Sequence, residues 1–269
     1  MDEKVSIIMG VFNCSETLAE AIDSILNQTY TDWKFIICDD GSTDNTFQII
    51  KEYQKRYSDK FVILKNEKNM GLNYTLNRCL KEAKGEYVAR MDGDDISLPE
   101  RLKKEVEFLE SHSEYAIVST PMIFFDENGE WKRGKTKIVV PKIRDFVFNA
   151  PFHCHAPCMI RRKAFMAVNG YTVDKRLLRY EDCNLWYKLY AAGYQGYNLQ
   201  EPLYMMRDDR NAYKRRTIES RMRAVYVQWV GFKMVHMPLK YYPYLVIEFL
   251  KSVIIVILPE KIYNLLHRR

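Results

Sequence analysis

The chain has 269 residues, of which 47% are hydrophobic and 28% charged, and this balance excludes a disordered chain, a collagen-like repeat and a small disulfide-stapled protein. One large domain, or one domain with an appended module, is expected, because single cores stop growing near roughly 250 to 300 residues. The net charge of +6 is unevenly distributed. Residues 207–269 hold 13 Lys or Arg and 5 Asp or Glu, a balance of +8, whereas residues 1–206 have a balance of −2.

The first part of the chain alternates strand and helix patterns, which is typical of a parallel sheet with crossover helices. Short apolar runs predict strands over residues 5–11, 33–38, 61–65 and 86–91. Helical periodicity predicts helices over residues 46–57 and 73–83. The first helix is expected to start at Asn13, because Glu16 completes a capping-box pattern with it.

The second part is less regular. The patterns predict a helix over residues 98–111, a strand over 115–120, a hairpin over 124–132 that turns at Asn128 and Gly129, and a strand over 158–160. A helix is expected over residues 181–193, opened by Glu181 and Asp182 and closed by Gly193.

Polar residues follow three of the predicted strands where each strand ends: Asn13, then Asp39 and Asp40, then Asp92, Asp94 and Asp95. Ligands of open α/β sheets bind beyond the carboxyl ends of the strands, so these side chains define the expected site. No glycine-rich dinucleotide or phosphate loop follows the first strand, and the site is acidic instead. An anionic ligand can approach such carboxylates only through a divalent cation, and oxygen ligands together with a diphosphate suit Mg²⁺ or Mn²⁺.

Three motifs occur together in this order: DDGSTD at residues 39–44, GEYVARMDGDD at 85–95 and YEDCNLWYKL at 180–189. Through them, residues 4–206 resemble the inverting family 2 glycosyltransferases of the GT-A fold, an α/β fold with a Rossmann-like mixed sheet flanked by helices. The resemblance implies transfer of a sugar from a nucleotide-diphospho-sugar, usually a UDP-sugar, to an acceptor hydroxyl. It also implies a role in building capsule, exopolysaccharide or O-antigen units, with a lipid-linked saccharide as the acceptor.

Carried over by position, the resemblance implies a nucleotide-binding set of Val11, Phe12, Asn13, Glu16, Asp40, Asp92 and Arg207. Asp40 would accept a hydrogen bond from the uracil ring. Asp92 and Asp94 match the D-x-D motif of the family, in which the first acid touches ribose or metal and the second coordinates the metal. The alternative for these acids is a solvated turn, because Asp and Gly favour turns.

Displacement at the anomeric carbon requires a carboxylate within reach of the attacking hydroxyl. Asp182 matches the aspartate of the E-D pair of the family and is the expected base, and Glu181 would orient it or the acceptor. The alternative is that both acids only complement the dipole of the helix that they begin. The stereochemical inversion is implied by the resemblance alone.

The resemblance also points to an acceptor side near His155, Trp186, Arg215 and Arg216. The cluster of His153, Cys154, His155 and Cys158 raises zinc as an alternative, but its spacing does not match a structural zinc site. Many family members have a histidine two residues after the position of Arg207. This chain has Asp209 there, so the third metal ligand stays open.

The basic C-terminal quarter is expected to form a helical module over residues 207–269, after a catalytic domain over 1–206. Helical spacing of Met222, Val225, Tyr226, Trp229 and Phe232 predicts an amphipathic helix whose apolar face rests on the catalytic domain or in lipid. Residues 241–258 are apolar but interrupted by charges, which favours an interfacial helix over a spanning one. Plain core packing is the other alternative.

Basic clusters beside an apolar run suit an anionic membrane surface better than nucleic acid, so we expect no nucleic-acid partner. The first residues lack the features of a secretory leader and the six cysteines are scattered. The expected location is therefore the cytoplasmic face of the plasma membrane. Two other functions fit parts of the pattern. One is a sugar nucleotidyltransferase, but the glycine-rich loop typical of that class is absent between Met9 and Ser15. The other is a scaffold protein that binds a nucleotide-sugar without turnover.

Overall fold

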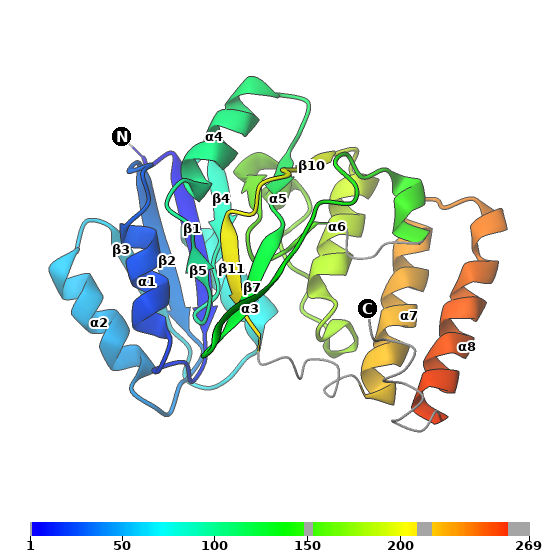
Figure 1. Cartoon of the computed structure of the whole chain (residues 1–269), viewed down its shortest axis with the longest axis horizontal. Helices are drawn as coiled ribbons and strands as arrows, with labels where there is room; N and C mark the ends of the chain where they lie inside the picture. Colours follow the sequence, from blue (N-terminus) through cyan, green and yellow to red (C-terminus); the bar gives the residue numbers. More distant parts are fainter. Residues whose placement is uncertain (1, 148–152, 209–216, 258–269) are drawn as a thin grey trace.

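The computed structural model describes residues 2–147, 153–208 and 217–257, and Figure 1 shows their arrangement. The central sheet consists of β1 (Val5–Val11), β2 (Trp33–Asp39), β3 (Phe61–Lys65), β4 (Tyr87–Arg90), β6 (Ile117–Ser119), β9 (Met159–Arg161) and β10 (Gly196–Asn198). Their order across the sheet is β10-β6-β9-β4-β1-β2-β3. The sheet is mixed, because β9 runs antiparallel to both of its neighbours, β4 and β6, while the other pairs are parallel.

A smaller sheet lies against one end of the central one. It is formed by β5 (Ile96–Ser97), β7 (Met122–Asp126), β8 (Gly129–Arg133) and β11 (Tyr204–Arg207), in the order β5-β11-β7-β8. The β7–β8 pair is the predicted hairpin. Pairing of β11 with β5 brings Arg207 to the loop that holds the DGDD acids.

Helices cover both faces of the central sheet. One face carries α1 (Leu18–Leu26), α2 (Thr46–Arg56) and α4 (Arg101–Ser111). The other carries α3 (Leu72–Glu82), α5 (Arg162–Ala167), α6 (Glu181–Ala191) and α7 (Ile218–Met234), and α8 (Pro243–Ile257) lies outside α7 (Figure 1). Because successive strand residues point to opposite faces, Ile7 and Met9 of β1 enter one core and Ile8 enters the other. Burial on both faces explains why β1 is a continuous apolar run.

The predicted start of the first helix is wrong. Helix α1 begins at Leu18 after Thr17, and no side chain caps it. Asn13 instead has a left-handed backbone with φ of 50°. Its side-chain oxygen accepts a hydrogen bond from the Thr43 N–H in another loop, at 2.9 Å, and is therefore not used as a cap. The helix over 98–111 also begins later than predicted, at Arg101, because β5 and a turn precede it.

The predicted apolar face of the helix near residues 217–237 packs on the protein only in part, through Phe232 and Tyr226. Val227, Gly231 and Phe232 of α7 are buried, whereas Met222 and Trp229 are exposed. Phe232 belongs to the same core as α3, α5 and α6. The predicted boundary at residue 207 falls on the last residue of β11, and the division into two units stays a prediction.

Within the described residues, no helix combines the length and the apolar character that crossing a bilayer requires. Helix α8 covers much of the apolar run of residues 241–258. Glu248 and Lys251 share a face of it, as predicted, and form an ion pair at 2.8 Å.

Candidate active site

The polar ends of the parallel strands meet at one edge of the sheet. Val11 at the end of β1 pairs with Asp39 at the end of β2, and Ile8 of β1 pairs with Arg90 at the end of β4. The loop after β1, the DDGSTD loop and the DGDD loop therefore start side by side. This confirms the expectation that a parallel sheet would bring these three segments together.

The DDGSTD loop fixes the loop that follows β1. In addition to the bond between Asn13 and Thr43, the carboxylate of Asp44 accepts the N–H groups of Ser15 at 3.1 Å and Thr46 at 3.0 Å. Hydrogen bonds from Thr46 and Ser15 hold the pKa of Asp44 well below its usual range, so it stays ionised. The loop after β1 is thus held in place before any ligand arrives. Of the predicted nucleotide-binding residues in it, Val11 is buried and Phe12 is exposed.

Asp40 lies at the same edge, but its carboxylate oxygens already accept hydrogen bonds from other groups of the protein. It is 4% exposed, and its two oxygens accept the N–H groups of Met70 at 2.9 Å and Gly71 at 2.8 Å. Asn66 donates a further hydrogen bond to it. Gly71, with φ of 89°, adopts a backbone that L side chains rarely take. Asp40 therefore holds the loop before α3, and its contact with a uracil ring stays a prediction, as does a role for the exposed Glu16.

The DGDD loop packs directly against the loop after β1. The Thr17 hydroxyl donates to the Gly93 carbonyl at 2.9 Å. A Cβ on Gly93 would lie 2.9 Å from Val11 and 3.0 Å from the Cys14 sulfur, so only glycine fits between the two loops. This close approach explains why the D-x-D motif of this chain has glycine at its centre.

The three acids of the DGDD loop differ in their surroundings. Asp95 is 3% exposed and accepts the Arg207 N–H at 2.8 Å, so it has a structural role. Asp94 is exposed and Asp92 is half-buried. Loss of hydration and then the charge of Asp92 raise the pKa of Asp94, and both also raise that of Asp95. A cation would relieve this repulsion.

The donor set at this loop fits a hard divalent cation only if ligands from outside the protein complete the coordination. Asp92 and Asp94 offer carboxylate oxygens, which Mg²⁺ and Mn²⁺ prefer. No group of three or more His, Cys, Asp or Glu residues that could hold a metal occurs in the described part of the chain. Among the described residues of this loop, Asp92 and Asp94 are the carboxylates that would be offered to such a cation, and a diphosphate and water would complete its coordination.

Arg207 is brought to the DGDD loop from the far end of the sequence. Besides its bond to Asp95, its Nε donates to the Asp94 carbonyl at 3.0 Å, and its guanidinium forms an ion pair with Glu20 of α1. It also lies over the Phe125 ring, 4.5 Å from the centroid. Arg207 thus joins the two sheets beside the candidate metal ligands. Asp209, Arg210, Lys214, Arg215 and Arg216 lie outside the described residues.

Arg90, the last residue of β4, was missed by the sequence analysis. It is 6% exposed and forms an ion pair with Asp92 at 2.6 Å. Burial raises the pKa of Asp94, Glu181 and Asp182, and the charge of Arg90 opposes this rise in all three. The available signal was a charged residue inside an otherwise buried strand, directly before the acidic cluster.

Glu181 and Asp182 lie in the first turn of α6, as predicted. The Asp182 carboxylate accepts the N–H of Cys183 at 2.8 Å. Burial raises the pKa of both acids, and the charge of Arg90 opposes this. One oxygen of Glu181 is buried without a hydrogen-bond partner among the described residues. The pair is therefore an acidic group in a desolvated site, and titratable groups with such perturbed pKa values are candidates for functional residues.

The predicted acceptor-side residues His155 and Trp186 have structural contacts. His155 Nε2 lies 2.8 Å from the Tyr171 hydroxyl, and its ring packs edge-on against Trp186. Burial keeps the pKa of His155 well below its usual value, so it is neutral. Trp186 is completely buried, which leaves no surface for an acceptor. His153 makes contacts with Asn198 at 2.7 Å and with Tyr190, and the described residues contain no zinc cluster.

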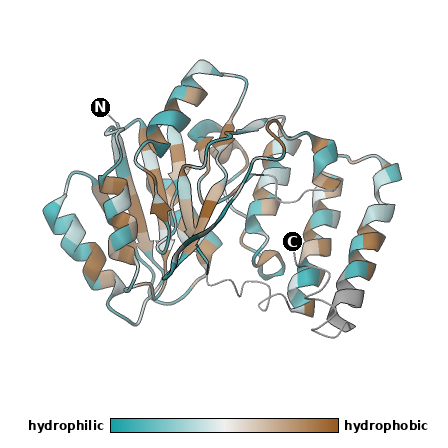
Figure 2. Cartoon of the chain, viewed as in Figure 1, coloured by the Kyte–Doolittle hydropathy of each residue, from teal (hydrophilic) through white to brown (hydrophobic). Residues whose placement is uncertain are grey.

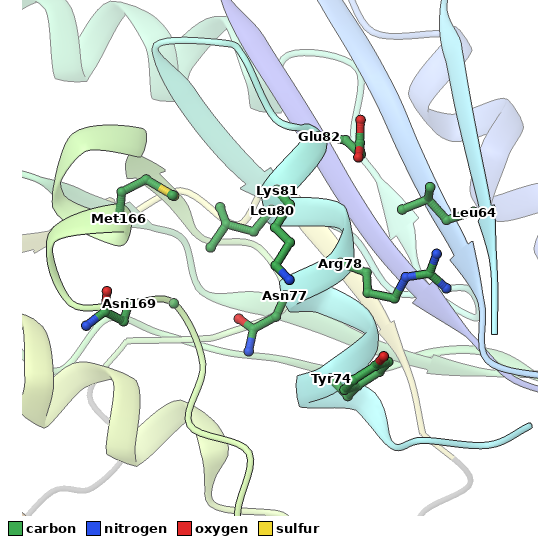
Figure 3. A pocket seen from close by; sticks show the side chains of 10 residues that line it. Leu64, Tyr74, Asn77, Arg78, Leu80, Lys81, Glu82, Met166 and Asn169 are labelled. Atoms are coloured by element: carbon green, nitrogen blue, oxygen red, sulfur yellow. The ribbon is translucent and has the colours of Figure 1, made fainter.

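A separate groove of about 460 Å³ runs along α3 (Figure 3). Tyr74, Asn77, Arg78 and Lys81 line it from the helix. Arg78 also donates a hydrogen bond to Asn66, which in turn donates one to Asp40. The groove is therefore connected to Asp40 through two hydrogen bonds. None of the acids of the candidate active site lines it.

Comparison with known proteins identifies the class that this fold and site define. Residues 6–168 match the family model described as glycosyl transferase family 2. The match covers more than half of the chain, and the chain belongs to this family. It is a glycosyltransferase with the GT-A fold.

Two curated relatives extend over most of the chain. The Bacillus subtilis protein EpsE is 41% identical over 266 residues, which cover 99% of this chain and 94% of EpsE. The amylovoran biosynthesis glycosyltransferase AmsE of Erwinia amylovora is 30% identical over 207 residues and covers 75% of each chain.

Solved structures share the fold at low identity. TarS of S. aureus in complex with UDP-GlcNAc has a TM-score of 0.67 and 17% identity, and the alignment covers 93% of this chain and 81% of that one. The mannosyltransferase PcManGT of Pyrobaculum calidifontis, solved with GDP-Man and Mn²⁺, also has a TM-score of 0.67, at 18% identity, with 94% of this chain and 74% of that one covered.

Proposed function

We propose that the protein transfers a sugar from a UDP-sugar to a saccharide hydroxyl, with inversion, during synthesis of a bacterial surface polysaccharide. The proposal is carried by Arg90, which forms an ion pair with Asp92 of the D-x-D motif and whose charge also acts on Glu181 and Asp182. The cation that neutralises a leaving diphosphate and the base that deprotonates an attacking hydroxyl need different carboxylates, and these come from the loop after β4 and from the first turn of α6. The UDP and UDP-GlcNAc complexes of TarS support the choice of donor.

Asp182 acts as the general base in this proposal. Burial raises its pKa, which makes it a stronger proton acceptor than an exposed aspartate. Glu181, with its unpartnered oxygen, orients the acceptor hydroxyl toward Asp182. Removal of the proton as the hydroxyl attacks the anomeric carbon allows a single displacement, and a single displacement inverts that centre.

Asp92 and Asp94 would hold Mg²⁺ or Mn²⁺, which when bound neutralises the charge that develops on the departing diphosphate. Arg90 keeps the Asp92 carboxylate in place through their ion pair at 2.6 Å. The Mn²⁺ complex of PcManGT supports a metal-dependent reaction.

A lipid-linked saccharide is the proposed acceptor, reached at the cytoplasmic face of the plasma membrane. WfaP of Escherichia coli, 36% identical over 121 residues, is named as a glucosyltransferase acting on α-D-GlcNAc-diphosphoundecaprenol, which supports an acceptor of this class. The name of AmsE, which places it in amylovoran biosynthesis, supports the role in polysaccharide synthesis.

The test is a panel of UDP-sugars with Mn²⁺, with UDP release as the readout. The wild-type protein is expected to hydrolyse one donor slowly without an acceptor and faster with a lipid-linked saccharide. The Asp182→Asn variant should keep its UDP affinity and lose at least roughly a hundredfold in transfer, the scale of general-base catalysis. Binding of donors without any turnover would instead indicate a scaffold, and near-normal turnover of the variant would point to another base.

A further inference from the structure

Over residues 243–251, helix α8 leaves most of its apolar side chains exposed to water. Leu245 is buried against α7, but Val246 is 59% exposed, Ile247 42% and Leu250 51%. Figure 1 shows α8 at the outer edge of the molecule, and Figure 2 shows hydrophobic residues along it. Adjacent exposed apolar side chains of this size mark a contact surface.

The end of α7 and the junction before α8 also expose apolar and basic side chains. Leu239, in the short helix η4 (Leu239–Tyr241) between them, is 82% exposed. Trp229 near the end of α7 is 41% exposed, and the Lys233 ammonium lies 3.6 Å from its ring centroid. Tryptophan beside lysine is typical of side chains at the headgroup level of a bilayer.

The charges of the helix pair are distributed unevenly. Glu248 pairs with Lys251 at 2.8 Å and Glu219 pairs with Arg223 at 2.6 Å. Within each pair the two charges offset one another. Lys233 and Lys240 have no carboxylate partner among the residues that the structure describes. The surface therefore presents an apolar patch together with unpaired positive charge.

We propose that this surface docks the enzyme on an anionic lipid bilayer, with α8 lying in the plane of the interface. The docking face consists of Trp229, Lys233, Leu239, Lys240, Val246, Ile247 and Leu250. The apolar side chains enter the boundary between headgroups and acyl chains, and the two lysines contact anionic headgroups. The inference rests on the proposed function, in which a lipid-linked acceptor makes docking useful because it confines enzyme and acceptor to one surface.

The unpaired lysines favour lipid over a second copy of the chain as the occupant. In a two-fold dimer this face would meet the same face of a second copy. The docking face contains two lysines and no acidic residue, so a second copy would offer it like charge and no opposite charge. An anionic bilayer supplies the opposite charge over the whole face.

The test is flotation of the full-length protein with vesicles of 30% phosphatidylglycerol in phosphatidylcholine, against vesicles of phosphatidylcholine alone. The wild type should float with the anionic vesicles. An Ile247→Asp/Leu250→Asp variant should lose at least roughly tenfold in partition, and a Lys233→Ser/Lys240→Ser variant should lose the preference for anionic lipid. Met166→Asp is the matched control, because Met166 is 45% exposed on α5 and its replacement should leave flotation unchanged.

Two further measurements keep the outcomes distinct. UDP release from the donor in vesicle-free buffer should be the same for the wild type and the docking variants. If the wild type floats with the anionic vesicles but releases no UDP from any donor, the proposed function is overturned and the docking is not. Equal flotation of the wild type and the Ile247→Asp/Leu250→Asp variant, or a dimer in sedimentation that only this variant disrupts, would overturn the docking.

Discussion

Arg90 shows how one side chain can set the chemistry of several others. It ends a strand whose other residues are buried, so its guanidinium is held at the edge of the sheet and does not extend into water. The Arg101 side chain donates to the Arg90 carbonyl at 2.7 Å, which further fixes the end of β4. It pairs with Asp92, and its charge also acts on Asp94, Glu181 and Asp182, the other acids of the proposed site. Without this cation, burial alone would push the pKa of Glu181 and Asp182 higher.

Replacing Arg90 is expected to change the pH dependence of transfer. The folded pKa of Asp182 lies above 3.8, so activity falls as the pH drops through that raised value and the base becomes protonated. Arg90→Met removes a charge that lowers this pKa, so the acidic limb of the rate against pH should move to higher pH. Arg90→Lys keeps the charge and should retain most of the original profile. An unmoved limb in Arg90→Met would contradict the electrostatic role.

Asp94 is the more exposed of the two proposed metal ligands, and its replacement tests the cation directly. Asp94→Asn should weaken UDP binding in the presence of Mn²⁺ by at least about tenfold, with little change in EDTA, because loss of one carboxylate weakens the metal that links protein and diphosphate. Isothermal titration with UDP measures this. Asp59→Asn, in the turn after α2, is the control and should bind as the wild type does. Unchanged Mn²⁺-dependent affinity would remove Asp94 from the site.

At the scale of elements, the site depends on loops that are hydrogen-bonded to one another in the absence of substrate. The DDGSTD loop holds the loop after β1, and that loop holds the DGDD loop through Thr17 and Gly93. Because each loop starts at the end of a parallel strand, a small shift in one would move the others. Rigid loops of this kind reduce the ordering cost of binding a donor.

Asp44 is the residue whose loss should loosen this assembly. Asp44→Ala removes acceptors for the N–H groups of Ser15 and Thr46 at the start of α2, and should lower the free energy of unfolding by about 1 kcal/mol, as loss of a helix-capping side chain does. The folded pKa of Asp44 is depressed, so its contribution is present above the unfolded pKa and is lost as the pH falls through the folded value. Urea unfolding at pH 7 and near pH 3 measures both effects. Glu52→Ala, an exposed change within α2, is the control, and an equal effect of the two would contradict the role of Asp44.

At the scale of the whole molecule, the C-terminal helices share a core with the catalytic elements. Val227 and Phe232 of α7 and Leu245 of α8 belong to the same cluster as Leu76 of α3 and Trp186 of α6. Basic composition alone suggested a separate module, but these contacts join α7 to α6 through a buried interface. We therefore expect the described helices to unfold together with the sheet.

Gly231 provides the test of this shared core. A Cβ at this position would overlap the ring of Tyr187, which is 1% exposed and packs between α6 and α7. Gly231→Ala should destabilise the whole protein by about 1–2 kcal/mol, because the overpacking cost exceeds the gain in helix propensity. Calorimetry should show one transition at a lower temperature, and Met222→Ala on the exposed side of α7 should shift it little. Two separate transitions, with only the smaller one shifted, would show an independent module.

The sequence by itself determined the strand and helix pattern, the acidic edge of the sheet and the start of α6 at Glu181, because these depend on local periodicity and on the rule that parallel strands end at one edge. Tertiary structure decided the rest. Asn13 bonds to Thr43 and does not cap α1, Asp40 holds a loop, and Arg90 pairs with Asp92. The side of α7 that is buried was decided in the same way. These outcomes depend on partners far away in the sequence, and a side chain with several chemically suitable partners takes the one that the packed fold places within reach.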